Sequence, residues 1–318
     1  MKQKFNPWKH CKVDPDSLKD NKYVNPPLPP PAGDDDAGSG AGEGGDAGSG
    51  NDDNDNPDVN IIDAKDFLIL EDIVCYGSDG KIFEQHDKLE IAKDVMRSAK
   101  EFYDATKKKP KHVDFTPYQA ISHFEKQKNG LFLPSYACQT VALVKLFQAS
   151  VRKKQDGSFE IINQEFEKVL QQYKNYCPGH GYHNNNTIVD GAGGRIIHYP
   201  SKDDFTSHGG TVDINQVRRR VEKPFPTDMD RSSSSLEDAL KDAQKLTYTK
   251  DLTGLKNPGI LLDLAKYFGK TAWAWPAASD RTCSAWLGCN NYDRFNIDSN
   301  DYLNVSYAAR GVREPKAS

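Results

Sequence analysis

The sequence predicts a mixed α+β fold, and three features of the chain support this prediction. Apolar residues recur at helical spacing through much of residues 88–176. Strand-like runs lie on both sides of this part, at residues 60–83 and 271–309. Residues 25–58 consist mainly of Pro, Gly, Ser, Asp and Asn, a composition that is typical of a disordered linker before a folded domain.

The chain of 318 residues divides by composition into three parts. Residues 1–24 form a polar head, in which Phe5 and Trp8 are candidate anchors. Residues 25–58 form the linker, with a semi-rigid proline segment followed by a flexible acidic one. Residues 59–318 form the folded domain. We therefore expect the head to attach the protein to a larger assembly, and the linker to hold the domain away from it.

Charge and composition argue against several classes of function. The net charge of −4 and the pI of about 6.1 predict no surface for general nucleic-acid binding. The basic cluster Arg218-Arg219-Arg220 is too short to change this expectation. The mean hydropathy is −0.75, and no apolar run reaches the length of a membrane span. The first residues contain no apolar stretch of the kind found in a secretory signal, so we expect any export to use another route.

The folded domain is predicted to begin with a hairpin and two helices. Residues 60–83 contain two strand-like runs around the turn Gly77-Ser78-Asp79-Gly80. Residues 88–107 carry apolar side chains at helical spacing. Thr116 is a typical N-cap residue, and Pro117 suits the first position of the helix that follows.

The middle of the chain predicts further helices and one long irregular segment. Ser135 is a candidate N-cap for a helix that runs to about residue 153, and a turn follows at residues 155–158. A helix is then expected at residues 163–176. Residues 177–235 are rich in Gly, Asn and His, and we predict an irregular loop there. Short helices are expected after it, at residues 236–245 and 258–268.

The irregular segment contains a possible metal-binding pattern. Cys177, His180 and His183 have the spacing C-x2-H-x2-H, and His198 and His208 follow. Thiolate and imidazole groups are zinc ligands, but this spacing is not that of a standard zinc finger. We therefore favour a polar surface loop without a metal or cofactor.

The six cysteines form no paired CxxC units. Cys138 lies in an apolar helical stretch, so we predict a small buried side chain. Cys283 and Cys289 lie near the C-terminus and are predicted to be structural thiols or a disulfide. A redox or metal-binding pair is the alternative for these two residues.

Residues 290–307 are the strongest candidate for a binding site. From Asn290 to Asp301, seven of twelve residues are Asn or Asp, and we interpret this run as a recognition loop without a core face. The strand-like alternation at residues 302–309 then predicts one continuous outward patch. The candidate ligand-binding residues are Asn290, Asn291, Tyr292, Arg294, Phe295, Asn296, Asp298, Asn300, Tyr302, Asn304 and Ser306.

The order of the C-terminal segments resembles a known family. A Trp-containing strand (AWAWPAAS) is followed by CSAWLG, by the Asn/Asp/Tyr-rich run and by YAARGVRE. This order resembles the C-terminal part of C-type-lectin-fold proteins of the formylglycine-generating-enzyme type. In that family a terminal Gly-Phe-Arg-like strand closes the fold, and Gly311-Val312-Arg313 stands in its place here.

The Asn/Asp/Tyr-rich run is similar to the variable region of diversity-generating retroelement target proteins. Adenine-directed mutagenesis in that family yields Asn, Asp, Tyr, Ser, Ile and Phe at exposed positions. Matching residue types stand at Asn290, Asn291, Tyr292, Asn296, Ile297 and Tyr302. The resemblance implies a C-type-lectin-like scaffold that displays these side chains to a protein or glycan ligand. It also implies a place on a virion or an extracellular surface, with attachment through the N-terminus.

The alternative is an enzyme of the formylglycine-generating type that uses Cys283 and Cys289. Five residues separate these two cysteines, more than separate the copper-binding pair of that family. The calcium-binding motifs of sugar-binding animal lectins, Glu-Pro-Asn and Trp-Asn-Asp, do not occur in the sequence. The sequence therefore favours a non-enzymatic recognition protein, and it leaves the ligand, the oligomeric state and the host open.

Overall fold

A computed structural model describes most of the chain from residue 66 to residue 315. The described residues are 66–95, 103–104, 109–110, 115–125, 127, 130–175, 181–206, 218–290, 293–303 and 307–315. The head and linker predicted for residues 1–58 lie outside them. The other predicted functional residues outside them are Cys177, His180, His208, Asn291, Tyr292, Asn304 and Ser306. Within the described ranges, no helix is long and apolar enough to cross a membrane.

The described part is a mixed α+β structure that begins with the predicted hairpin. Strand β1 (Phe67–Tyr76) pairs antiparallel with β2 (Ile82–Ala92) around the turn at residues 77–80. The helix predicted from residue 88 is wrong over residues 88–92, because these residues continue β2 and pair with β1. Over so short a run, the apolar residues fit both the helical period and the strand period. Pairing with β1 decides for the strand.

The C-terminal end of the chain closes this hairpin into a three-stranded sheet. Strand β16 (Val312–Arg313) pairs antiparallel with β2, and the Arg313 guanidinium forms an ion pair with Glu90. Arg310 is fully buried and donates hydrogen bonds to the Ala92 carbonyl and to the Gln172 side chain. A buried guanidinium is tolerated only with such partners, so Arg310 fixes the path of the chain into β16.

Both predicted N-caps in the first half of the chain are confirmed. Helix α2 (Pro117–Glu125) begins with a reciprocal cap: the Gln119 N–H donates to the Thr116 hydroxyl (3.3 Å), and the Thr116 N–H donates to the Gln119 side chain (3.0 Å). Helix α3 (Tyr136–Ser150) begins at Ser135, whose hydroxyl accepts from the N–H three positions later (3.0 Å).

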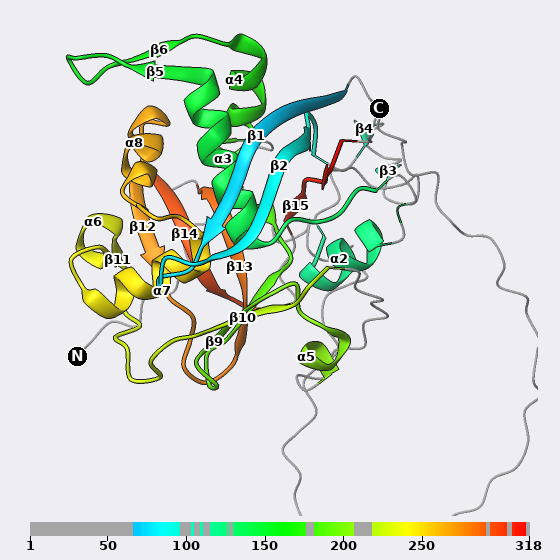
Figure 1. Ribbon diagram of the computed structural model, residues 1–318, viewed down its shortest axis with the longest axis vertical. Coiled ribbons are helices and arrows are strands. Elements are labelled where there is room, and N and C mark those ends of the chain that lie inside the picture. The colour runs from blue at the N-terminus through cyan, green and yellow to red at the C-terminus, as the bar shows by residue number, and fades with distance from the viewer. Residues whose placement is uncertain are drawn as a thin grey trace, which may run out of the picture. The chain divides into compact units, whose positions relative to one another are not determined.

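Helix α3 is the centre of the hydrophobic core. It is buried on nearly all sides, as expected for a helix that is apolar all round, and Cys138 is buried within it. It lies between the hairpin and the large sheet and contacts β1 and β13 (Figure 1). Three further helices pack against it, namely α4 (Gln164–Gln171), α7 (Ala243–Thr253) and α8 (Ile260–Tyr267).

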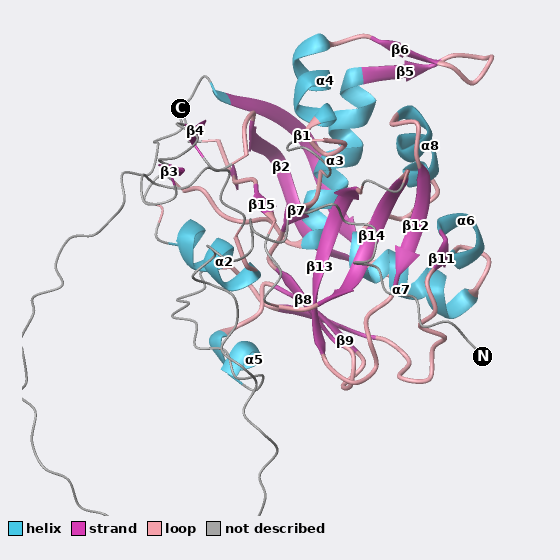
Figure 2. Cartoon of the chain, turned by 180° about the vertical axis from the view of Figure 1, so that it is seen from behind, coloured by secondary structure: helices cyan, strands magenta, loops and turns pink. Residues whose placement is uncertain are grey.

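The second sheet has nine strands among the described residues and carries the C-terminal segments of interest (Figure 2). Its main order is β10-β9-β8-β13-β14-β12-β11, and β7 and β15 pair beside β13. The strands are β7 (His183–Asn184), β8 (Thr187–Asp190), β9 (Arg195–His198), β10 (Val221–Pro224), β11 (Ser234–Ser235), β12 (Thr271–Trp275), β13 (Thr282–Cys289), β14 (Arg294–Asp301) and β15 (Ala308–Ala309).

The prediction of an irregular loop at residues 177–235 is wrong for about half of its described part. These residues supply β7 to β11 and helix α5 (Lys202–Thr206). Their strands are two to four residues long, which is too short to give a period in the sequence. The remaining elements are β3 (Tyr103–Asp104), β4 (Lys109–Pro110), β5 (Val151–Lys153), β6 (Phe159–Ile161) and α6 (Leu236–Ala239).

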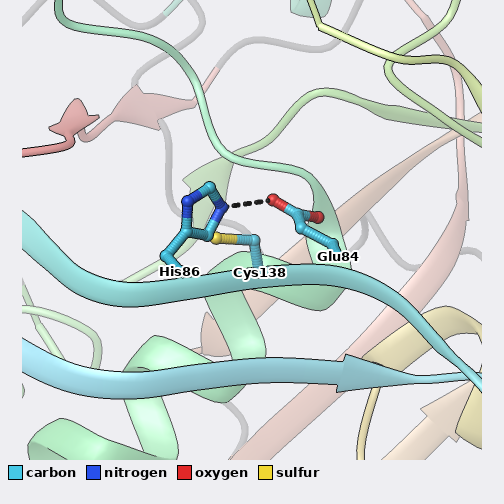
Figure 3. A group of neighbouring side chains, drawn as sticks. All are labelled: Glu84, His86 and Cys138. Atoms are coloured by element: carbon cyan, nitrogen blue, oxygen red, sulfur yellow. Dashed lines mark hydrogen bonds and ion pairs between the residues drawn. The ribbon is translucent and has the colours of Figure 1, made fainter.

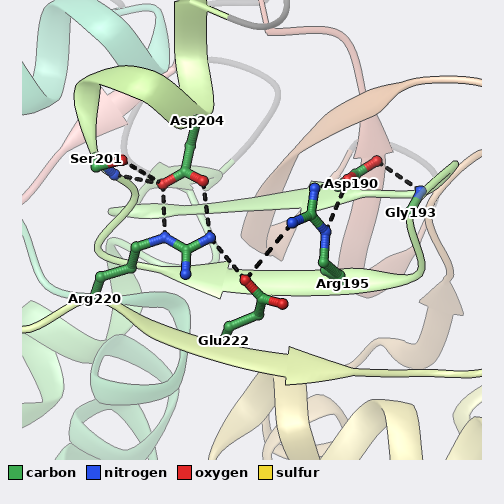
Figure 4. Close-up of polar contacts among 7 residues, drawn as sticks. All are labelled: Asp190, Gly193, Arg195, Ser201, Asp204, Arg220 and Glu222. Atoms are coloured by element: carbon green, nitrogen blue, oxygen red, sulfur yellow. Dashed lines mark hydrogen bonds and ion pairs between the residues drawn. The ribbon is translucent and has the colours of Figure 1, made fainter.

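A chain of ion pairs fastens α5 to the edge of the large sheet (Figure 4). Arg195 contacts Asp190 at 2.5 Å and Glu222 at 3.8 Å. Arg220 contacts Glu222 and Asp204, both at 2.8 Å. Arg220 belongs to the only basic cluster noted in the sequence, and its charge is matched here by two carboxylates. These contacts therefore give it a structural role.

Candidate functional site

Residues 294–301 form a strand in the middle of the large sheet. β14 runs parallel to β12 and antiparallel to β13. The prediction that residues 290–301 have no core face is therefore wrong. Phe295, Ile297 and Ser299 point into the core and are almost completely buried. These residues alternate with polar ones over only a few positions. In a run so rich in Asn and Asp, this short alternation is not recognisable as a strand period.

Side chains along β14 point alternately to the two faces of the sheet, and this separates the predicted site residues into two groups. Phe295 was expected to offer an aromatic contact to a ligand, but its ring is fully buried and lies 6.0 Å from the Phe268 ring. That expectation is wrong. Arg294, Asn296 and Asp298 have the opposite parity, so they lie on the face of the strand that is turned away from the core.

Tryptophans from both neighbouring strands lie beside these polar residues. In the sheet register, Trp273 of β12 is opposite Asn296, and Trp275 is opposite Asp298. On the other side, Trp286 of β13 is also opposite Asp298. We call this side of the sheet the β14 face, and it consists of Trp273, Trp275, Trp286, Arg294, Asn296, Asp298 and Asp301. Trp286 and Asn296 are buried within it, whereas the other five are less completely covered.

A register shift brings Asp301 to the β14 face. Trp286 pairs with Asp298, whereas Ser284, two residues earlier, pairs with Asp301, three residues later. The extra residue in β14 is a bulge, and it reverses the parity of the positions after it. Asp301 therefore lies on the same side as Asp298. Simple alternation along the strand would place Asp301 on the opposite side, and Asp301 is not among the candidate residues taken from the sequence.

Asn296 supports the β14 face rather than offering itself to a ligand. Its side chain accepts from the Trp275 indole N–H (3.1 Å) and donates to the Tyr182 hydroxyl, and the residue is buried. Tyr182 stands edge-on to Tyr307 (5.0 Å between ring centroids), which stands edge-on to Trp286 (4.3 Å). These aromatic partners come from distant parts of the chain, and nothing in the sequence analysis identified Tyr182.

Asp298 and Asp301 are the electrostatic centre of the site. Burial raises the pKa of Asp298, and the neighbouring charge of Asp301 raises it further. Burial also raises the pKa of Asp301, although the Tyr307 hydroxyl (3.3 Å) and the charge of Arg281 oppose this. Ionising both carboxyl groups is unfavourable in the free protein. A positively charged group placed between them would relieve this repulsion.

The rim of the site is aromatic and cationic. The Arg294 guanidinium lies 3.8 Å over the Trp273 ring, and that of Arg281 lies 4.3 Å over Tyr302. Tyr302 is 56% exposed, as expected for a contact residue. Asn290 has a structural role, because its side chain accepts from the Arg294 N–H (3.3 Å) at the entry to β14.

Two polar atoms at this site have no hydrogen-bond partner among the residues that the structure describes. They are the indole nitrogen of Trp286, which is fully buried, and the side-chain oxygen of Asn300. Buried polar atoms usually have partners in native proteins, so such atoms call for an explanation. A bound ligand with its own polar groups would provide one.

The cysteines considered for catalysis do not have the features of reactive thiols. Cys283 and Cys289 are free, so the disulfide alternative between them is wrong. Both are fully buried in β13. Burial raises the pKa of Cys289 to about 12. Burial also raises the pKa of Cys283 above its ordinary value. Both thiols keep their protons at neutral pH, whereas thiol chemistry needs the thiolate.

The two described histidines of the predicted loop are packed into the structure. The His183 ring is stacked on Tyr173 (4.1 Å), and its Nδ1 lies 2.8 Å from the Gly181 carbonyl oxygen. His198 is hydrogen-bonded to Thr187 and to the Asp251 carbonyl, and burial lowers its pKa to about 4. These contacts give both rings structural roles.

Comparison with known proteins returned no match. No protein family, no curated protein and no solved structure matches this chain. Any proposal about its function therefore rests on the residues and the geometry described above.

Proposed function

We propose that the protein is a non-enzymatic recognition protein whose β14 face binds a ligand. The observation that carries this proposal is the register of the sheet. It gathers three tryptophans, Arg294 and two carboxylates on the side of β14 that is turned away from the core. Aromatic surface beside a few fixed polar groups is typical of binding sites.

We further propose that the domain has a C-type-lectin-like fold. β16 pairs with β2 and so closes the β1–β2 hairpin into a sheet. This supports the proposal, because the resemblance of Gly311-Val312-Arg313 implies a terminal strand in this place. The location of the candidate site on the second sheet, on strands near the C-terminus, is also consistent with it. In this proposal the N-terminal head attaches the domain to a virion or to a cell-surface assembly.

The charges of the site favour a protein ligand that presents a basic group. Asp298 and Asp301 repel each other in the free protein, and a Lys or Arg side chain between them would form two charge-assisted hydrogen bonds. Trp275 and Tyr302 would contact the apolar part of such a side chain. A glycan that stacks on the same rings is the other ligand class that the sequence suggested.

The burial pattern limits which positions could vary in a retroelement-type variable region. Arg294, Asp298, Asn300 and Tyr302 are half-buried or exposed, whereas Phe295, Asn296 and Ile297 are buried. We expect variation to be tolerated in the first group only. We expect the genome to hold a near-copy of the DNA for residues 280–313, differing mainly at adenines, beside a reverse transcriptase gene, and sequencing of the neighbouring DNA checks this.

A display library tests whether the β14 face is a binding surface. Arg294 and Asp298 of the β14 face and the adjacent Asn300 and Tyr302, all half-buried or exposed, are randomised together, and the full chain is displayed on cells. Folded members are selected by protease resistance and then tested against a basic protein, lysozyme. We expect many folded members and, among them, binders to lysozyme.

A matched library shows whether binding is specific to this face. It randomises four exposed positions of the β5–β6 hairpin: Arg152, Lys154, Glu160 and Ile162. We expect its members to fold and not to bind. The proposal fails if randomising the β14 face unfolds nearly every member, or if both libraries give binders at the same frequency.

A further inference from the structure

A separate cavity of about 630 Å³ lies beside β2, and its wall is mostly apolar. Phe83, Phe124 and Phe132 contribute to it, and Arg218 also lines it, with its guanidinium 3.3 Å from the centre of the Phe132 ring. Three polar residues of β2, Glu84, Gln85 and His86, also line this cavity. Binding pockets commonly combine an apolar wall with a few polar groups in this way.

Glu84, His86 and Cys138 form a compact group at the cavity wall (Figure 3). One ligand atom from each residue lies within 4.8 Å of the others, and no other such group of three occurs among the described residues. A carboxylate oxygen, an imidazole nitrogen and a thiol sulfur are all zinc ligands. Neither Glu84 nor His86 was noted in the sequence, because Cys138 lies 52 positions beyond His86.

Neighbouring side chains hold the potential ligands in place. The Nδ1 atom of His86 lies 3.1 Å from a carboxylate oxygen of Glu314, and its Nε2 atom lies 3.0 Å from Glu84. A histidine that binds a metal through one nitrogen usually donates its other N–H to a carboxylate or carbonyl, which is the position of Glu314 here. Glu84 also accepts from the hydroxyls of Ser135 (2.8 Å) and Tyr199 (2.6 Å).

Tyr199 adds an independent sign of function. Its φ angle is 53°, a left-handed conformation that is rare for a bulky residue other than glycine. Its N–H donates to the Asn186 carbonyl (2.8 Å), and this conformation accompanies the hydrogen bond from its hydroxyl to Glu84. Strained backbone of this kind is concentrated at functional sites.

We propose that Glu84, His86 and Cys138 bind a Zn²⁺ ion at the wall of this cavity. Zn²⁺ with three protein ligands keeps a fourth position for water or an exchangeable ligand. Glu84 and His86 line the cavity and Cys138 does not, so the fourth position faces the cavity. Arg218 also lines the cavity and forms an ion pair with Glu314 (3.6 Å), and its positive charge favours a small anion as the exchangeable ligand.

The geometry requires only small adjustments for the ion to bind. A tetrahedral Zn²⁺ with bonds of about 2.0–2.3 Å keeps its ligand atoms roughly 3.5 Å apart, so the side chains must close by about 1 Å. When the metal binds, the Cys138 S–H bond breaks, and the proton of the hydrogen bond between His86 Nε2 and Glu84 is displaced; both protons go to water. His86 binds as the neutral imidazole and keeps its Nδ1–H bond to Glu314.

Metal titration of the full chain tests the site directly. The protein is treated with a chelator, desalted, and titrated with Zn²⁺ by calorimetry and with Co²⁺ by absorbance. We expect one equivalent of either metal and a thiolate-to-cobalt charge-transfer band. Cys138→Ala should abolish both signals. Cys75→Ala, which changes another fully buried thiol of the same core cluster, should keep them.

A second variant avoids any effect on the core. The Glu314 side chain is 60% exposed, so Glu314→Gln should fold normally. We expect it to weaken Zn²⁺ binding about 10–100-fold, the usual effect of removing the partner of a metal-binding histidine. Glu71→Gln, at an equally exposed carboxylate of β1, should leave the affinity unchanged.

Added azide tests whether the fourth position is open. We expect it to change the absorption spectrum of the cobalt-loaded protein, and an unchanged spectrum would show a closed site. The whole proposal is wrong if no stoichiometric metal binds, or if Cys138→Ala and Glu314→Gln bind metal as tightly as the wild type. In that case the group is a hydrogen-bonded network that joins β2 to α3.

Discussion

The carboxyl groups of Asp298 and Asp301 lie on one side of β14 because of a single extra residue in that strand. Their proximity is unfavourable for folding, since burial and mutual repulsion raise the pKa of Asp298. Groups that lower stability persist mainly where function requires them. At the residue scale, this pair is therefore the strongest sign that the β14 face has a binding role.

We expect Asp298→Asn to stabilise the protein at pH 7 and not at pH 4. A carboxyl whose pKa is raised in the folded state favours folding below its unfolded pKa of about 3.9, and this contribution is lost as the pH rises through the folded pKa. Removing the charge should increase the free energy of unfolding at pH 7 by about 0.5–2 kcal/mol. Urea denaturation at both pH values measures this.

Asp156 provides the control for this prediction. It lies in the exposed β5–β6 turn, and hydrogen bonds from Ser158 lower its pKa. Asp156→Asn should therefore give no gain in stability at pH 7. An equal gain from both substitutions would show that overall negative charge, and not the pair on β14, is responsible.

At the scale of elements, the N-caps of α2 and α3 can be compared with each other. The Thr116 hydroxyl only caps its helix, whereas the buried Ser135 hydroxyl caps α3 and also donates to Glu84 (2.8 Å). We expect Thr116→Ala to lower the free energy of unfolding by about 0.5–2 kcal/mol. Ser135→Ala should lower it by roughly 2–4 kcal/mol, because Glu84 also loses a donor. Equal losses in urea denaturation would argue that the bond to Glu84 contributes little.

Elements with a local chemical signal could be predicted from the sequence. The caps at Thr116 and Ser135 and the turns at residues 77–80 and 155–158 depend on neighbouring residues only. The strands β7 to β10 and the bulge in β14 depend on pairing with distant segments, which no short window contains. The same holds for the candidate site. Its place in residues 290–307 could be recognised from the local composition, but the burial of Phe295 depends on the pairing of β14 with distant strands and could not be predicted.

For the whole molecule, the main feature is that its C-terminal strand completes the first sheet of the described domain. β16 pairs with β2, and Phe132 exchanges backbone hydrogen bonds with Val312 (2.8 and 3.0 Å). Arg310 is buried beside them. The last residues thus join the hairpin to the segment that leads into α3, and they also place Glu314 against His86.

We therefore expect the domain to fold only when its C-terminal strand is present. Removing residues 308–318 deletes β15 and β16, exposes the edge of β2 and removes Arg310 from its buried partners. This variant should show no cooperative thermal transition by circular dichroism and should be digested rapidly by protease. Removing residues 316–318 alone should leave the transition unchanged. A cooperative transition near the wild-type Tm after the longer truncation would show that β16 contributes little, because the hairpin and α3 would then form a stable core without it.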